Sequence, residues 1–280
     1  MPLLRPDGSE AISPTAHYTG YVWARNQLSP PELGTREGRV FYESLRAPMV
    51  VSEVLGGGTL EAYLLARHRA IDALLERAID EHGVTQVLEV AAGMSGRGLR
   101  FTRRYGERLR YVEADLPAMA ARKRRALERL SAISPRHRVE ELDALSDTGP
   151  RSLAQLVQTL NRDGGLAIIT EGLLGYLEPS DVRALWRRFA GALATFTPGV
   201  YISDIHIGEV HNLRVKAFRL VLAAFVRGPV HLHFGHQPEV VAALKEAGFA
   251  SAHIHRAFEL SDDGGDSAAR LSHTLEAWMA

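Results

Sequence analysis

The sequence contains no cysteine among its 280 residues. A disulfide framework and a cysteine-ligated metal site are therefore both excluded. Neither sign of charge is in excess, because 33 lysine and arginine residues balance 33 aspartate and glutamate residues. This balance argues against broad electrostatic binding to nucleic acid or to an anionic membrane, so we expect neither as a partner.

Long apolar runs are missing as well. The longest, LVLAAFV at 220–226, is far shorter than the roughly 20 residues that a membrane span needs. The N-terminal MPLLRPDGSE lacks the basic segment followed by an apolar one that marks a signal peptide. A chain of this length can bury a substantial core. We therefore expect a soluble, cytoplasmic, globular protein.

A third absence concerns the order of glycines. VLEVAAGMSGRG at 87–98 is an apolar run that ends in small residues, and YVEAD at 111–115 is a second apolar run that ends on a carboxylate. This is the plan of the first βαβ unit of a nucleotide-binding α/β fold. However, two other residues follow Gly93 before the next glycine, so the G-x-G-x-x-G order of a diphosphate cradle is absent. Glu89 adds negative charge near this loop, which a cationic ligand such as S-adenosylmethionine (SAM) tolerates better than pyrophosphate does.

Hydrophobic periodicity predicts helices first and then alternating strands and helices. The alternation from residue 84 predicts a Rossmann-like α/β fold with a mostly parallel seven-stranded sheet and helices on both faces. We expect a helical N-terminal cap over 1–83 and a ligand-binding domain over 84–280. The turn-rich SDDGGDS at 261–267 predicts that the last strand returns antiparallel. Strands are expected at 85–91, 109–114, 137–142, 165–170, 199–205, 251–258 and 271–278, and helices at 15–26, 35–47, 59–83, 96–105, 117–131, 151–161, 179–196, 211–226 and 237–248.

Polar residues recur at the predicted carboxyl ends of the strands, where ligands of an open α/β sheet bind. Any one of them could instead cap a helix or a turn, but their recurrence at consecutive strand ends predicts one crevice. They are Glu89 and Gly93 after the first strand, Glu113 and Asp115 on the second, Asp143 after the third, Glu171 after the fourth, and Asp204 and His206 on the fifth.

These residues lie in segments that resemble the leucine carboxyl methyltransferase family of class I SAM-dependent methyltransferases. The resemblance rests on LLARHRAID (64–72), LEVAAGMSGRG (88–98), YVEADLPAMAARKR (111–124) and TEGLLGYL (170–177) in this order. Animal and fungal members have G-x-G in the loop, whereas this chain has Ala-Ala-Gly, which is more similar to the bacterial branch that acts on natural products. Because Ala91 carries a Cβ, we expect its φ to be negative.

The resemblance implies a role for individual residues in binding SAM, whose product is S-adenosylhomocysteine. A guanidinium suits the fork-to-fork contact with the SAM carboxylate that is implied for Arg67. Tyr176 matches a tyrosine beside the methyl-transfer site. The other implied cofactor residues are Gly93 beside the methionine part, Asp115 at the ribose, Asp143 with Leu142 or Ala144 at the adenine, and Glu171 near the methionyl end. We add Glu89 to the cofactor-binding residues because its negative charge suits a cationic ligand.

Histidines are the natural general bases if the acceptor is a hydroxyl, whereas a carboxylate acceptor needs none. His206 and His233 are the candidates, with His211, His231 and His236 close by in sequence. Histidines of the HLHFGH segment (231–236) together with Asp204 would form a zinc site. No fixed fourth ligand is evident, so we expect no metal. The alternative to a catalytic role for His206 or His233 is that these histidines lie in the core or in a lid and form hydrogen bonds with the backbone.

Two further segments are interpreted from their patterns. Arg122, Lys123, Arg124 and Arg125 spread around a helix, which favours a solvated face. The amphipathic segment 213–226 fits a lid over the site or the surface of a homodimer.

The sequence as a whole predicts a SAM-dependent O-methyltransferase. Its acceptor is expected to be a carboxylate or phenolic hydroxyl of a small molecule, natural product or peptide C-terminus. Three alternatives stay open because fold alone does not fix a reaction. They are a nicotinamide-dependent oxidoreductase, a SAM-binding protein without catalysis, and a histidine-metal hydrolase.

Overall fold

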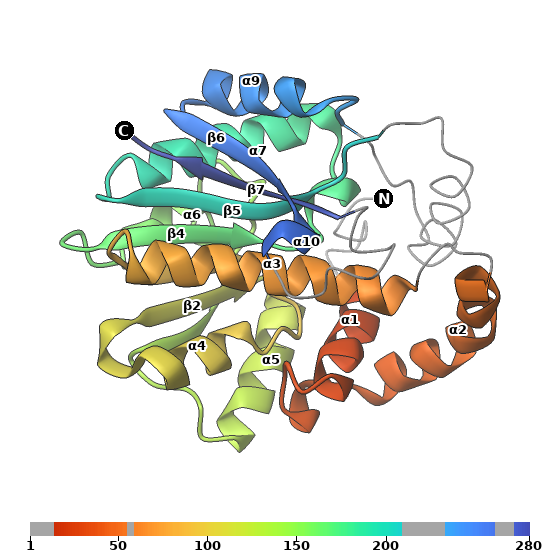
Figure 1. Cartoon of the computed structure of the whole chain (residues 1–280). Helices are drawn as coiled ribbons and strands as arrows, with labels where there is room; N and C mark the ends of the chain where they lie inside the picture. The colour runs from red at the N-terminus through yellow and green to blue at the C-terminus, as the bar shows by residue number, and fades with distance from the viewer. Residues whose placement is uncertain (1–13, 55–58, 209–232, 261–271) are drawn as a thin grey trace.

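One seven-stranded sheet forms the centre of the molecule. The computed structural model describes residues 14–54, 59–208, 233–260 and 272–280 (Figure 1). The strand order is β3-β2-β1-β4-β5-β7-β6, and β7 pairs antiparallel with both β5 and β6 while the other pairs are parallel. This confirms the mostly parallel sheet and its returning last strand. The strands are β1 (Val84–Val90), β2 (Arg110–Asp115), β3 (His137–Glu141), β4 (Gly165–Thr170), β5 (Gly199–Ile205), β6 (Ser251–Arg256) and β7 (His273–Trp278).

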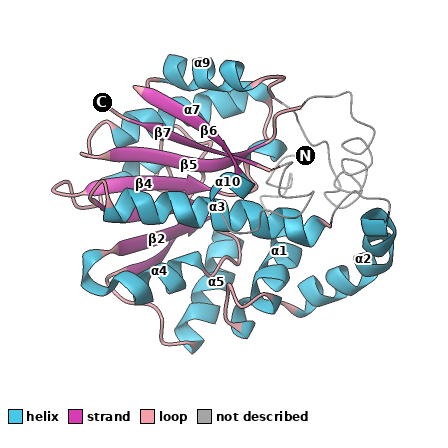
Figure 2. Ribbon diagram, viewed as in Figure 1, coloured by secondary structure: helices cyan, strands magenta, loops and turns pink. Residues whose placement is uncertain are grey.

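Helices cover both faces of the sheet (Figure 2). Successive strand residues point to opposite faces, and in the central strands both sets are apolar. Leu88 and Val90 pack with α6, α7 and α9 on one face, and Val87 packs with α3 and α4 on the other. Helix α5 packs on Val139 of β3. The bounds are α3 (Leu60–Asp80), α4 (Arg97–Tyr105), α5 (Pro117–Arg129), α6 (Leu153–Val157), α7 (Pro179–Leu193), α9 (Gln237–Ala247) and the short α10 (Ala257–Leu260).

The cap consists of α1 (Pro14–Arg25) and α2 (Arg36–Val54) with the start of α3, and a cluster of Tyr18, Val22, Leu60, Tyr63 and Leu64 holds it together. The remainder of α3 packs on the sheet. Cap and sheet therefore share this helix, and the division of the chain at residue 83 stays a prediction. Within the described ranges, no helix is long and apolar enough to cross a membrane.

The expected elements differ from the structure in a few places. Helix α6 is only five residues long, because the chain turns after Gln158. Strand β6 ends at Arg256, and α10 follows directly. Helix α2 extends beyond the expected 35–47. The expected helix at 211–226, and with it the lid or dimer interpretation, lies outside the described residues.

Candidate active site

The glycine loop after β1 and the end of β2 are joined directly. The backbone N–H of Gly93 donates to Asp115 Oδ2 at 2.7 Å, and the N–H of Leu116 donates to Oδ1 at 2.8 Å. Glu113, the other acidic residue of β2, is fully buried and binds His137 and Lys123. Of the two acidic residues on β2, only Asp115 therefore lies at the strand tip beside the loop.

The loop contains two residues in the left-handed region. Gly93 has φ +50° and Ala91 has φ +55°. The expectation of a negative φ at Ala91 is therefore wrong. The chain leaves a buried strand and turns at once, because the N–H of Ala92 donates back to Ala114 O of β2 at 3.2 Å. A methyl group is small enough for the left-handed region, although the conformation costs an L-residue about 1–2 kcal/mol.

Helix α1 packs onto this loop. A Cβ at Gly93 would stand 3.7 Å from the Cβ of Ala16, and a Cβ at Gly20 would stand only 2.8 Å from the Cβ of Met94. The cap is therefore in van der Waals contact with the segment that the sequence assigns to the cofactor. Tyr176, in the 3-10 turn η3 (Leu174–Tyr176), adds a second contact because its hydroxyl donates to Thr15 Oγ1 at 2.7 Å.

Arg67 and Glu171, to which the sequence resemblance gives roles in SAM binding, meet at the end of β4. Arg67 Nε donates to Glu171 Oε1 at 3.1 Å, and Nη1 donates to Asp204 Oδ2 at 3.3 Å. Both partners of each pair are buried. Burial by itself would raise the pKa of Glu171, but the neighbouring His68 and Arg97 lower it well below its usual value. Glu171 is therefore an ionised carboxylate inside the protein.

Arg97 is the residue that sequence reasoning missed. It is completely buried, and its guanidinium donates to three carboxylates: Asp72 Oδ1 at 2.6 Å, Glu89 Oε1 at 2.6 Å and Glu171 Oε2 at 2.7 Å. The second oxygen of Glu89 accepts from Tyr111 OH at 2.8 Å. Glu89 therefore lies within this internal network. A lone arginine between two glycines, eight residues after a buried glutamate, was the available signal.

His68 lies between two arginines of this network. Its Nε2 lies 2.7 Å from Arg100 Nη2, and its Nδ1 lies 2.9 Å from Arg97 Nη2 and 2.7 Å from Glu171 Oε2. A guanidinium can only donate, so each ring nitrogen faces an N–H donor. Burial and the Arg97 guanidinium lower the pKa of His68, which favours a neutral ring. The Trp23 ring covers the imidazole at a centroid distance of 4.8 Å.

The end of β5 is connected to α3 at a second point. His206 Nε2 lies 2.9 Å from the hydroxyl of Tyr63, one helical turn before Arg67. His233 Nε2 donates to the carbonyl oxygen of Leu174 at 2.9 Å, so this histidine lies beside η3. The structure thus brings Arg67, Glu171, Tyr176, His206 and His233 around the ends of β4 and β5.

The remaining candidates have other surroundings. Asp143 Oδ1 accepts the N–H of Leu145 at 3.1 Å in a turn, and Ala144 packs against the core beside it. His236 is exposed and precedes α9. His211 and His231 lie outside the described residues. In the described part of the chain no three histidine or acidic side chains are grouped to hold a metal ion.

The basic run on α5 is not a purely solvated face, which corrects the expectation. Lys123 is buried, forms an ion pair with Glu113, and donates to Ala92 O of the glycine loop at 3.3 Å. Burial would raise the pKa of Glu113, but Lys123 and His137 lower it. The run spreads around the helix as expected, and one of its four members must therefore face the sheet.

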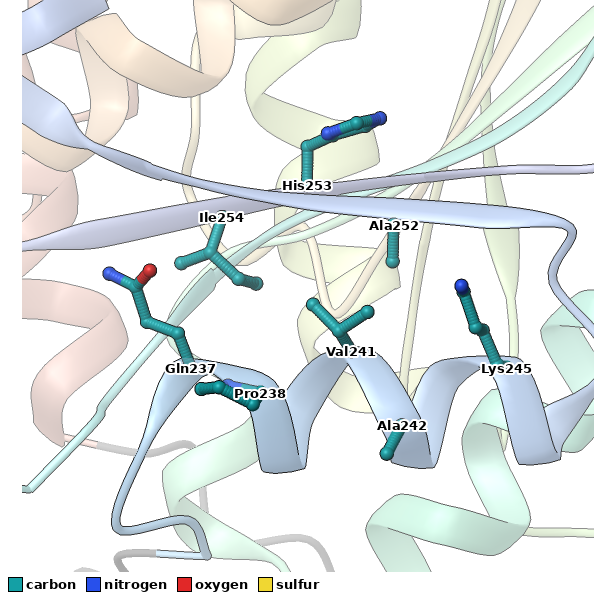
Figure 3. A pocket seen from close by; sticks show the side chains of 8 residues that line it. All are labelled: Gln237, Pro238, Val241, Ala242, Lys245, Ala252, His253 and Ile254. Carbon is teal, nitrogen blue, oxygen red and sulfur yellow. The ribbon is translucent and has the colours of Figure 1, made fainter.

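A groove of about 470 Å³ lies elsewhere, between α9 and the edge strand β6 (Figure 3). Val241, Ala252 and Ile254 line it, with Lys245 at one end. It is two strands away from β5 in the sheet order and contains none of the candidate residues. We assign no function to it.

Solved structures with this fold are methyltransferases in several cases. A putative methyltransferase from Thermobifida fusca YX is 14% identical, with a TM-score of 0.64, and the match covers 94% of this chain and 97% of that one. A DUF574 family protein from Streptomyces avermitilis MA-4680 is 15% identical, also at 0.64, with 95% and 97% covered. Human N-acetylserotonin methyltransferase in complex with SAM is 12% identical at 0.52, with 92% and 62% covered. At these identities the likeness shows the fold alone.

The chain spans only about half the length of two other matched structures, PigF with SAH and the pyocyanin biosynthetic protein PhzM. No curated protein matches it. A family model is more specific, since the model of leucine carboxyl methyltransferase matches residues 46–190, just over half of the chain. This range includes Arg67, the glycine loop, Asp115 and Glu171, whose contacts are described above. The chain therefore belongs to the leucine carboxyl methyltransferase family, a family of SAM-dependent methyltransferases.

Proposed function

We propose that this chain is a SAM-dependent O-methyltransferase. Its acceptor would be a carboxylate or phenolic hydroxyl of a small molecule, natural product or peptide C-terminus. The observation that carries the proposal is the contact of Gly93 N–H with Asp115 Oδ2 at the tip of β2. This contact lies inside the segment that the family model matches, and a glycine backbone beside a carboxylate at a strand tip supports a role for that carboxylate in holding the ribose.

The charges of the site fit SAM. Four buried or largely buried carboxylates, on Asp72, Glu89, Glu171 and Asp204, share the three guanidinium groups of Arg67, Arg97 and Arg100. With His68 neutral, this network carries an excess negative charge. SAM has a sulfonium, an ammonium and a carboxylate, and is therefore a net cation that such a network attracts. When bound, it supplies an electrophilic methyl group.

Each candidate residue has a proposed role in binding SAM or the acceptor. Asp115 would hold the ribose hydroxyls, and Asp143 with Ala144 would lie at the adenine. Arg67 and Glu171 would bind the carboxylate and the methionyl end, and Glu89 would act through Arg97. Tyr176, His206 and His233 would lie beside the acceptor. Holding the acceptor oxygen in line and excluding water is the main catalytic task in such a transfer.

The test is binding of S-adenosylhomocysteine by calorimetry and thermal shift. At about 100 times its dissociation constant, a ligand raises the free energy of unfolding by roughly 2.7 kcal/mol. For a chain of this size, this corresponds to an increase of about 5–10 °C in the melting temperature. Arg67→Ala and Asp115→Ala are each expected to weaken binding at least tenfold, about 1.4 kcal/mol, whereas Arg103→Ala, an exposed site on α4, is expected to have no effect. A shift with NAD and none with S-adenosylhomocysteine would exclude the proposal.

A further inference from the structure

Helix α3 and strand β5 meet at two matched points. On the helix, Tyr63 and Arg67 are four residues apart, which is about 6 Å of rise. On the strand side, Asp204 and His206 are two residues apart, about 6.7 Å. Because these spacings agree, Arg67 reaches Asp204 at 3.3 Å and Tyr63 reaches His206 Nε2 at 2.9 Å. The imidazole of His206 is thus fixed one helical turn away from the Arg67 guanidinium.

Burial and the contact with Tyr63 together determine which nitrogen of His206 an acceptor can reach. Tyr63 is 2% exposed and packs in the cap cluster, whereas His206 is half-buried. An acceptor therefore reaches the imidazole and not the tyrosine hydroxyl. Because Tyr63 contacts Nε2, the nitrogen left for the acceptor is Nδ1. This nitrogen carries a lone pair when Nε2 holds the ring proton and donates it to the Tyr63 oxygen.

The groups around His206 keep it neutral near pH 7. Burial is the largest cause and lowers the pKa of His206, Asp204 raises it, and Arg67 lowers it again. His233 and His273 also act to lower the same pKa. A neutral imidazole can accept a proton, as general base catalysis requires.

The same surroundings disfavour an anionic acceptor. Arg67, one helical turn from Tyr63, is already shared by Glu171 and Asp204. A carboxylate acceptor at this point would approach two carboxylates whose common cation is already engaged. Like charges in close contact are unfavourable, whereas a neutral hydroxyl avoids the conflict and needs a base.

We propose that His206, held through Nε2–H by the hydroxyl of Tyr63, accepts the proton of a hydroxyl group at Nδ1, so that the methyl acceptor is an alcohol or a phenol and not a carboxylate. The inference rests on the proposed methyl transfer. In the balanced step the acceptor oxygen forms a bond to the methyl carbon, the sulfur–methyl bond breaks with its electron pair left on sulfur, and the acceptor proton passes to Nδ1. The imidazolium then releases that proton to solvent. Tyr63 is a positioning residue in this step.

The first experiment needs no acceptor. Nitrogen NMR of ¹⁵N-histidine-labelled protein, with His206→Gln to assign the signals, reports the tautomer and the pKa of His206. We expect the Nε2-protonated tautomer. The hydrogen bond from Nε2–H to Tyr63 is stronger in the charged ring, so Tyr63→Phe is expected to lower the pKa by about 0.5–1 unit, from a hydrogen bond of roughly 0.5–1.5 kcal/mol. The control is Tyr105→Phe, which removes the hydrogen bond of another tyrosine, to Asp80, and leaves His206 unchanged. An Nδ1-protonated ring, or equal pKa values in both variants, would overturn the role of Tyr63.

The second experiment tests the acceptor class. Methyl transfer from radiolabelled SAM is measured to 4-nitrophenol, 4-methylumbelliferone and benzyl alcohol, and to 4-nitrobenzoate and phenylacetate. Transfer to at least one hydroxyl probe is expected, with His206→Gln slower by about 100-fold or more at unchanged affinity for S-adenosylhomocysteine. Failure of every hydroxyl probe, with or without carboxylate methylation, overturns the inference. If the natural chain does not bind S-adenosylhomocysteine, the proposed function is wrong. The NMR measurement of the His206 tautomer and pKa does not depend on that result.

Discussion

The backbone N–H of Gly93 donates to Asp115 Oδ2 at 2.7 Å and so joins the first two strands of the sheet at their carboxyl ends. The two residues are 22 positions apart, and each belongs to a different motif of the sequence. Their contact means that a substitution at Asp115 acts on the glycine loop as well as on any ligand.

Asp115→Asn and Asp115→Ala should therefore differ. Asparagine keeps an oxygen that can accept from Gly93 N–H, whereas alanine leaves this donor without its partner, which costs about 1–3 kcal/mol when the donor is buried. We expect Asp115→Ala to lower the free energy of unfolding in urea by more than Asp115→Asn does. Both should weaken S-adenosylhomocysteine binding, since neither retains the carboxylate. Asp147→Ala, at an exposed ion pair with Arg188, is the control for both measurements. Equal stability of the two Asp115 variants would contradict the role of the Gly93 contact.

Ala91→Gly is expected to stabilise the protein. The left-handed conformation at φ +55° costs alanine about 1–2 kcal/mol, and the added freedom of glycine in the unfolded chain offsets about 0.4–1 kcal/mol of the gain. The net increase in the free energy of unfolding should be about 0.5–1 kcal/mol by urea denaturation. Ala92→Gly is the matched control, because Ala92 is buried without a positive φ and should lose stability. Destabilisation by both substitutions would show that the loop does not hold Ala91 in this conformation.

Lys123→Met should be strongly destabilising. Removing one partner of a buried ion pair leaves the other charge uncompensated, which costs about 3–5 kcal/mol, and here Glu113 would keep only His137. Arg125→Met, two residues along the same helix and exposed, should change stability by less than about 0.5 kcal/mol. Thermal and urea unfolding followed by circular dichroism measure both variants. If the two substitutions cost the same, Lys123 is not paired as described.

Glu276 should make the stability depend on pH in the acid range. Burial would raise the pKa of Glu276, but hydrogen bonds from His255 and Arg77 lower it from 4.5 to about 2. A carboxyl whose folded pKa lies below its unfolded value stabilises the fold above the unfolded pKa. This contribution, at most about 3 kcal/mol, is lost as the pH falls from about 4.5 towards 2.

Glu276→Gln measures this contribution. The difference in the free energy of unfolding between the natural chain and the variant should be largest above pH 5 and should shrink as the pH falls towards 2. Glu107→Gln removes the exposed partner of Arg136 and should show no such trend. A difference that stays constant with pH would mean that the carboxyl titrates alike in the folded and unfolded chain.

Local patterns were sufficient for the framework. Short apolar runs that alternate with helical segments located the seven strands to within about two residues, and the turn-rich 261–267 segment indicated the returning last strand. The place of Asp115 at the end of its apolar run likewise indicated that its carboxylate lies at the strand tip. These features depend on residues that are neighbours in sequence or on the shared edge of a parallel sheet, so the sequence by itself determined them.

Tertiary structure decided which charged side chains are buried and with which partners. Arg97 contacts carboxylates 8, 25 and 74 positions away, and Lys123 carries the same local signal as the arginines beside it. Tyr63 meets His206 across 143 positions, because a helix and a strand happen to present matching spacings there. The positive φ of Ala91 likewise follows from the hydrogen bond that turns the chain back to β2. Such pairings depend on how distant elements pack, which composition and periodicity do not specify.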